Sequence, residues 1–107
     1  MMDDTEYREK LEKYVDLGIG AKAAWREVAA LEAQKQCDLE RLVAEITGDG
    51  GMSRTAAERQ ARVHPDYQGI KEKIRDGIYD AGVRDVKVTA LRLLLQRESL
   101  QVPPAAI

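Results

Sequence analysis

The chain has little of what a compact aromatic core requires. It contains no Phe, one Trp and four Tyr among 107 residues, so aromatic burial cannot dominate its stability. A single Cys excludes an internal disulfide, which is typical of a protein in a reducing compartment. Pro occurs only at positions 65, 103 and 104. Because proline is the strongest helix breaker, these absences favour two long helices.

Long hydrophobic runs are also absent. Apolar runs such as Leu93–Leu95 are far shorter than the roughly 20 residues that a membrane-spanning helix needs. No basic segment is followed by an apolar stretch, so we expect no secretory signal. These features predict a chain that does not associate with membranes and acts in the cytoplasm.

Charge is divided unevenly along the chain. Residues 1–50 hold 7 Lys and Arg against 12 Asp and Glu, a balance of −5, and residues 51–107 hold 10 against 7, a balance of +3. Two helices of opposite charge are expected to fold back on each other, with charges facing across an apolar seam. The net charge of −2 argues against a nucleic-acid binder that relies on overall attraction to phosphate.

The first segment has the apolar spacing of a long helix, from about residue 4 to residue 47. Small or apolar residues recur at alternating intervals of four and three, the spacing of a heptad seam. Two glycines in the seam region each cost up to about 1 kcal/mol in a helix, and a break at 18–20 is the alternative to a continuous helix. The seam consists of Tyr7, Leu11, Tyr14, Gly18, Ala21, Trp25 and Val28.

A glycine-rich turn and two further helices are predicted next. Gly48-Asp49-Gly50-Gly51 ends the first helix, because glycine adopts positive φ without a Cβ penalty. Thr55 and Glu58 have the spacing of a capping box, with Ser53 as a competing cap. This spacing predicts a short helix over about 53–63.

His64-Pro65 ends the short helix, since a residue before proline leaves the α region, and Pro65 suits the first turn of the next helix. That helix is predicted over about 65–99, followed by a frayed tail over 100–107. The Val83–Val88 segment also has the composition of a short strand, but its apolar spacing continues as a helix to Leu95.

The segment after the turn contains several short motifs that resemble those of small helical proteins from phages and prophages. The resemblance covers roughly residues 53–98 and rests on Thr55-Ala-Ala-Glu-Arg-x-Ala-Arg62, Pro65-x-Tyr67, Ala90-Leu91 and Gln96-Arg97-Glu98. It implies two long helices around a short one, and an accessory role near recombination genes in a bacterial host. The family usually has Ser or a similar cap before the proline, where this chain has His64. The resemblance implies no catalytic residue.

Two sets of side chains are candidates for binding a partner. The aromatic residues Tyr7, Tyr14 and Trp25 are of types that anchor interfaces, although packing against the second long helix is the alternative. A side stripe on the later helix extends the candidate surface. It consists of Tyr79, Val83, Val86, Ala90 and Leu93.

A basic face over residues 54–75 is the candidate site for nucleic acid. Its members are candidate phosphate contacts, or they pair with the acidic first helix. The face consists of Arg54, Arg59, Arg62, Lys71 and Lys73.

No constellation predicts chemistry. His64 and Cys37 are single residues of their types and lie far apart in sequence, which is not the pattern of a metal site or a nucleophile–base pair. Carboxylates at Glu72, Asp76 and Asp80 share a face with nearby cations, as on a solvated helix. We therefore expect no catalytic residue, metal, cofactor or small-molecule substrate.

These patterns predict one all-α domain over 1–107, an antiparallel helical hairpin that dimerises into a bundle or coiled coil. They favour a non-enzymatic protein that binds another protein. That partner is a recombination or replication enzyme, or a host defence complex that the protein blocks. The alternative is a recombination accessory that binds nucleic acid through the basic face.

Overall fold

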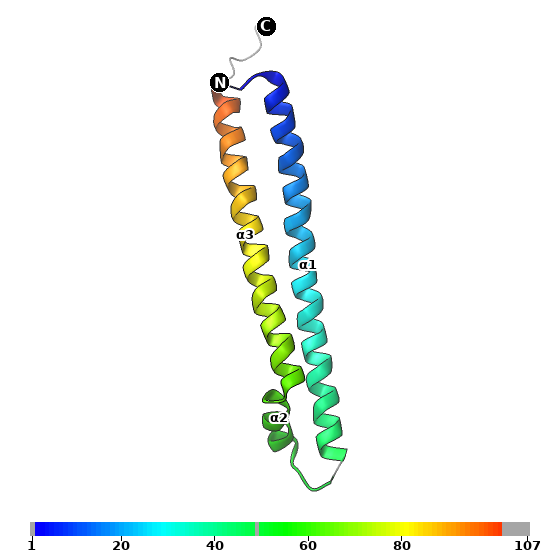
Figure 1. Ribbon diagram of the computed structural model, residues 1–107. Helices are drawn as coiled ribbons and strands as arrows, with labels where there is room; N and C mark the ends of the chain where they lie inside the picture. The colour runs from blue at the N-terminus through cyan, green and yellow to red at the C-terminus, as the bar shows by residue number, and fades with distance from the viewer. Residues whose placement is uncertain (1, 49, 102–107) are drawn as a thin grey trace. The chain divides into compact units, whose positions relative to one another are not determined.

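The computed structural model describes residues 2–48 and 50–101, with side chains described up to residue 99. Three helices make up these residues: α1 over Asp4–Gly48, α2 over Arg54–Arg62 and α3 over Pro65–Gln101 (Figure 1). No strand occurs among them, so the all-helical prediction is confirmed. The Val83–Val88 segment, which has strand-like composition, is helical.

Helix α1 is continuous through Gly18 and Gly20, so the alternative of a break at 18–20 is wrong. The two glycines cost at most about 2 kcal/mol together, and the continued helix places Ala21 in the interior directly after them. At the start of α1, the Asp3 carboxylate accepts a hydrogen bond from the backbone N–H of Glu6 at 2.8 Å. This contact is an N-terminal cap.

The segment between α1 and α2 contains two glycines in the left-handed region. Gly50 has φ of 96° and Gly51 has φ of 86°, a conformation that residues with a Cβ rarely adopt. Asp49, also part of the predicted turn, lies outside the described residues. The positive φ values are the reason that the chain uses glycine at 50 and 51.

The cap of α2 is Ser53, and the predicted capping box of Thr55 and Glu58 is wrong. The Ser53 hydroxyl accepts a hydrogen bond from the Ala56 N–H at 3.2 Å. Thr55 lies inside the helix, and the Glu58 carboxylate accepts instead from Arg54 Nε at 3.0 Å. Ser53 and Thr55 are both residues that can cap a helix, and they lie two positions apart. Glu58 forms its hydrogen bond with Arg54 and not with the backbone at the helix start.

Helix α3 begins at Pro65, as predicted, and His64 caps it. His64 Nδ1 accepts a hydrogen bond from the Asp66 N–H at 3.1 Å, and the His64 carbonyl accepts from the Gln68 N–H at 3.0 Å. At its other end the helix reaches Gln101, so residues 100 and 101 are helical and not part of a tail. The rest of the predicted tail, 102–107, lies outside the described residues.

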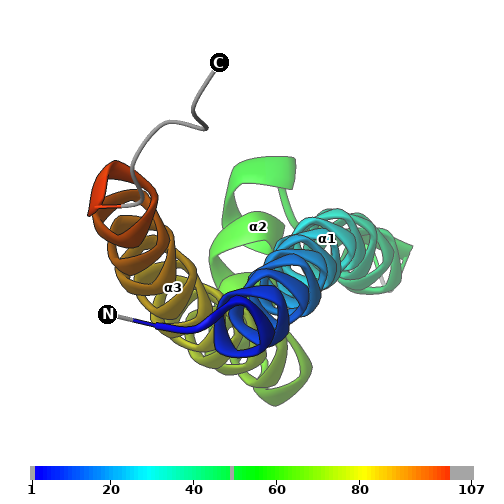
Figure 2. The same cartoon turned by 90° about the horizontal axis from the view of Figure 1, so that it is seen from above.

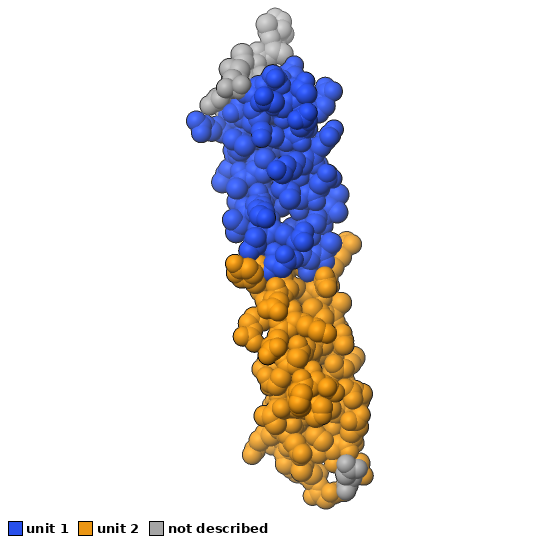
Figure 3. All heavy atoms as spheres, in the orientation of Figure 1, with its two compact units in different colours: residues 1–24, 80–107 blue, residues 25–79 orange. Residues whose placement is uncertain are grey.

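The chain divides into two compact units, each containing a segment of both long helices (Figure 3). Unit 2 is Trp25–Tyr79, and unit 1 is Met1–Ala24 with Asp80–Ile107. Within each unit the α1 segment and the α3 segment lie side by side and antiparallel (Figures 1 and 2). The prediction of one domain stays a prediction.

Unit 2 contains the larger buried hydrophobic core. Helix α2 lies beside the end of α1 and the start of α3, and its Ala57 and Ala61 are fully buried. Because alanine is small, the backbone of α2 approaches its neighbours closely. The core cluster consists of Leu39, Leu42, Val43, Ala57, Ala61 and Tyr67, with Ile46 packed against it.

Unit 1 buries much less. Of its described residues, those that are buried are Ala21, Ala81 and Leu95, two of which are alanines. The predicted seam is only partly interior, because Ala21 and Val28 are buried whereas Leu11 and Trp25 are about 40% exposed. A pair of helices buries one stripe of each, so the remaining large apolar residues face outward.

Glycines in α3 allow a test of the packing. Gly82→Ala is expected to raise the free energy of unfolding by about 0.5–1 kcal/mol, because a Cβ there meets no atom within 4 Å. Gly77→Ala is the matched control, since its Cβ would lie 3.1 Å from Val28 Cγ2, and we expect a smaller gain or a loss. Urea unfolding followed by circular dichroism measures both. An equal gain from the two would contradict the close contact between α3 and Val28.

Candidate interaction surfaces

The outer face of α3 in unit 1 is apolar and exposed. Val83, Val86, Ala90 and Leu93 recur at intervals of three and four residues, which places them on one helix face. Ala81, Val88 and Leu95, which are buried or half-buried, lie on the opposite side, facing the α1 segment. Val86 is 68% exposed and Leu93 is 56% exposed. We call these four residues the α3 stripe.

A second exposed apolar row lies on α1 in unit 1. Leu11, Val15 and Ile19 are spaced four residues apart, and Ile19 is 63% exposed. Sequence analysis missed Val15 and Ile19 because it followed the heptad seam. The signal that would have found them is the four-residue spacing that continues from Leu11 outside the seam.

The six residues predicted as an interaction surface are distributed over both units. In unit 1, Tyr7 and Tyr14 are half-buried in a groove of about 310 Å³ between the two helix segments, together with Leu95 and Ser99, whereas Val83 and Val86 belong to the α3 stripe. In unit 2, Trp25 is partly exposed and Tyr79 is 75% exposed.

Two of the five predicted phosphate contacts are held by carboxylates of the chain. Arg54 lies 3.0 Å from Glu40 of α1 and 3.0 Å from Glu58, and Arg62 lies 3.9 Å from Glu58. The hydrogen bond and charge of Glu40 raise the pKa of Arg54. The Arg54–Glu40 pair joins an acidic residue of the first half of the chain to a basic residue of the second half, as predicted.

A second pair that links two helices has the opposite orientation. Arg41 of α1 lies 3.7 Å from Asp66 of α3 and 3.1 Å from Glu45. The hydrogen bond to Glu45 is the main reason that the pKa of Arg41 is raised. All these partners are at the surface, where an ion pair contributes about 0–1 kcal/mol. These ion pairs therefore contribute little to holding the helices of unit 2 together.

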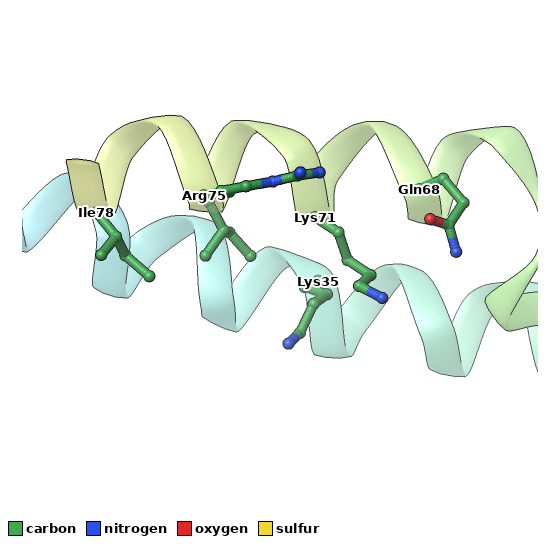
Figure 4. Close-up of a pocket in the computed structure, with 6 residues that line it drawn as sticks. Lys35, Gln68, Lys71, Arg75 and Ile78 are labelled. Carbon is green, nitrogen blue, oxygen red and sulfur yellow. The ribbon is translucent and has the colours of Figure 1, made fainter. Parts of the chain in front are cut away.

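A cationic groove lies between α1 and α3 in unit 2 (Figure 4). Its volume is about 420 Å³, and Ile74 and Ile78 form its apolar part. Gln68, Lys71 and Arg75 line it from α3, and Lys35 lines it from α1. Lys71 Nζ also lies 5.9 Å from the centre of the Tyr67 ring. Arg75 and Lys35 were not among the predicted site residues.

The remaining sequence candidates are not brought together. Cys37 is exposed, and His64 is occupied in capping α3. Asp80 pairs with Arg84 at 3.0 Å. Among the described residues no polar or charged side chain is buried, and no three metal-ligating side chains converge.

Comparison with protein-family models, with curated proteins and with solved structures gives no match. In the described part of the chain, no helix combines the length and the hydrophobicity needed to cross a membrane.

Proposed function

We propose that this protein is a non-enzymatic interaction module that dimerises and binds another protein. The observation that carries the proposal is the exposed α3 stripe of unit 1. Contiguous exposed apolar side chains on a soluble chain mark surfaces that another protein covers. Leu11, Val15 and Ile19 of α1 add to the apolar surface of the same unit.

The first partner of the α3 stripe is a second copy of the chain. An isologous contact places the same patch of both copies face to face, and apolar residues at intervals of three and four pack as in a helical bundle. Among the described residues, unit 1 buries two alanines and one leucine, so the contact supplies further apolar burial to this unit. The dimer is a four-helix arrangement in this unit.

The second partner is a different protein, a recombination or replication enzyme or a host defence complex. The resemblance of residues 53–98 to phage and prophage accessory proteins supports this class of partner and action in the bacterial cytoplasm.

Nucleic-acid binding through residues 54–75 has less support. Arg54 and Arg62 already contact Glu40 and Glu58, so phosphate would have to compete with these carboxylates. Arg59, Lys71 and Lys73 are exposed, but three cations give only a weak salt-dependent affinity. Titration of double-stranded DNA at low salt measures this alternative, and a steep loss of affinity with added salt would favour it over the proposal.

Sedimentation of a Val86→Ser variant tests the dimer. Each copy loses an exposed apolar side chain, so we expect dimerisation to weaken by about 10- to 30-fold, corresponding to about 1 kcal/mol for each valine. Valine and serine have similar helix propensity, so the isolated chain keeps its helix content.

Thr89→Ser is the control for this experiment, because Thr89 is an exposed polar residue beside the stripe and its substitution leaves all four apolar residues of the stripe in place. Its dimerisation constant should equal that of the unsubstituted protein. A protein that sediments as a monomer at concentrations up to about 1 mM, where an affinity of only about 4 kcal/mol would be visible, would contradict the proposal of a dimer.

A further inference from the structure

The groove of unit 2 has an unusual balance of charge. Three cations, Lys35, Lys71 and Arg75, line it, and no carboxylate does. None of the ion pairs formed in the described part of the chain uses any of the three. Elsewhere in unit 2, Arg41, Arg54 and Arg62 each have a carboxylate partner. The positive charges of the groove are thus not neutralised by carboxylates among the described residues, and an anionic ligand could neutralise them.

Part of the groove is lined by apolar side chains, whose exposure to water is unfavourable. Ile74 is buried at its floor, and Ile78 is 43% exposed beside it. Figure 4 shows the Arg75 side chain extending along α3 toward Lys71. A ligand that fits must therefore offer carboxylates and apolar side chains together.

The line of the groove along α3 suits a helix as the ligand. Gln68, Lys71, Arg75 and Ile78 are spaced by three, four and three residues, and together they extend roughly 15 Å along the helix at 1.5 Å per residue. Lys71 and Arg75 are about 6 Å apart along the axis, which matches two carboxylates four residues apart on a partner helix. Laying an amphipathic helix into a groove is a common mode of peptide recognition.

We infer that the groove formed by Lys35, Gln68, Lys71, Ile74, Arg75 and Ile78 binds an acidic amphipathic helix of the partner protein. A phosphate backbone fits it less well, because no aromatic side chain lines the groove to stack on bases, whereas the isoleucines match apolar side chains. The inference rests on the proposed role in protein binding and names the chemistry of the partner. It uses unit 2, whereas the dimer uses the α3 stripe of unit 1.

Nuclear magnetic resonance of the ¹⁵N-labelled full chain tests the inference. The probe is a capped helical peptide of about 16 residues, roughly 24 Å long, with pairs of Glu four residues apart flanking two Leu. We expect shifts of residue 35 and of residues 68–78, and binding that weakens as salt is added. A peptide with Gln in place of every Glu should bind about tenfold more weakly, as expected when two or more charge pairs are removed.

Charge-reversed variants locate the site. Lys71→Glu combined with Arg75→Glu should weaken binding of the acidic peptide by about tenfold or more. Arg59→Glu combined with Lys73→Glu changes the charge of unit 2 equally, at exposed residues that do not line the groove, and should have little effect. Circular dichroism establishes that both variants keep their helices.

Any of the following outcomes would overturn the inference. One is that the acidic peptide does not shift the resonances of the groove residues, and another is that the Gln peptide binds as tightly as the acidic one. A further one is that a single-stranded DNA oligonucleotide shifts these resonances at a lower concentration than the peptide does. Shifts of the groove residues that depend on protein concentration without peptide would assign the groove to a second copy and overturn the assignment to a partner protein. A monomer that still binds the acidic peptide would reject the dimer and leave this inference standing.

Discussion

Replacing Leu42 with alanine is expected to lower the free energy of unfolding by about 2–4 kcal/mol, the usual cost of a cavity in a packed core. Leu42 is 2% exposed and belongs to the core cluster in which α1 meets α2 and Tyr67. The buried neighbours in α2 are alanines, which cannot reach into the vacated space. Urea unfolding followed by circular dichroism at 222 nm measures the loss.

Leu93→Ala is the matched control for this substitution. It removes the same atoms from a residue of unit 1 that is 56% exposed, and in dilute solution we expect a loss below about 1 kcal/mol. Equal losses from the two substitutions would show that unit 1 is as well packed as unit 2 and would contradict the difference between their cores.

The helices and most of their boundaries can be predicted from the local properties of single residues in the sequence. Pro65 starts α3 because its missing N–H is harmless in a first turn, and Gly50 and Gly51 supply the positive φ that the segment after α1 requires. The predicted cap was wrong because Ser53 and Thr55 both have cap chemistry. Choosing between them depends on Arg54, whose ion pairs with Glu40 and Glu58 involve a residue on another helix.

The candidate surfaces were only partly predictable. The α3 stripe follows from periodicity, since Val83 and Val86 were predicted and are exposed. Tyr7 and Tyr14 have the same seam spacing as Val28, but periodicity does not distinguish a residue that lines a groove from one that is buried. The cationic groove required the pairing of α1 with α3, because Lys35 and Arg75 are far apart in sequence and each alone has the appearance of an ordinary surface cation.

Unequal packing of the two units has a consequence for local stability. In dilute solution, amide hydrogens around Val86 in unit 1 are expected to exchange on the order of 100-fold faster than those around Leu42 in unit 2. This ratio corresponds to a difference of about 3 kcal/mol in the free energy of local opening. The reason is the difference in buried residues. In the described part of unit 1 these are two alanines and a leucine, whereas unit 2 buries Leu39, Leu42, Val43 and Tyr67 among others.

Dimerisation through the α3 stripe makes this difference depend on concentration. Ligands that bind only the closed state stabilise it by mass action, and a second copy acts as such a ligand for unit 1. We therefore expect exchange around Val86 to slow as protein concentration rises, while exchange around Leu42 changes less. The Val86→Ser variant should lose the concentration dependence at the same protein concentrations, and Thr89→Ser should keep it. Concentration-dependent protection confined to unit 2 would move the dimer contact away from the α3 stripe, because only the unit that is covered gains stability from the second copy.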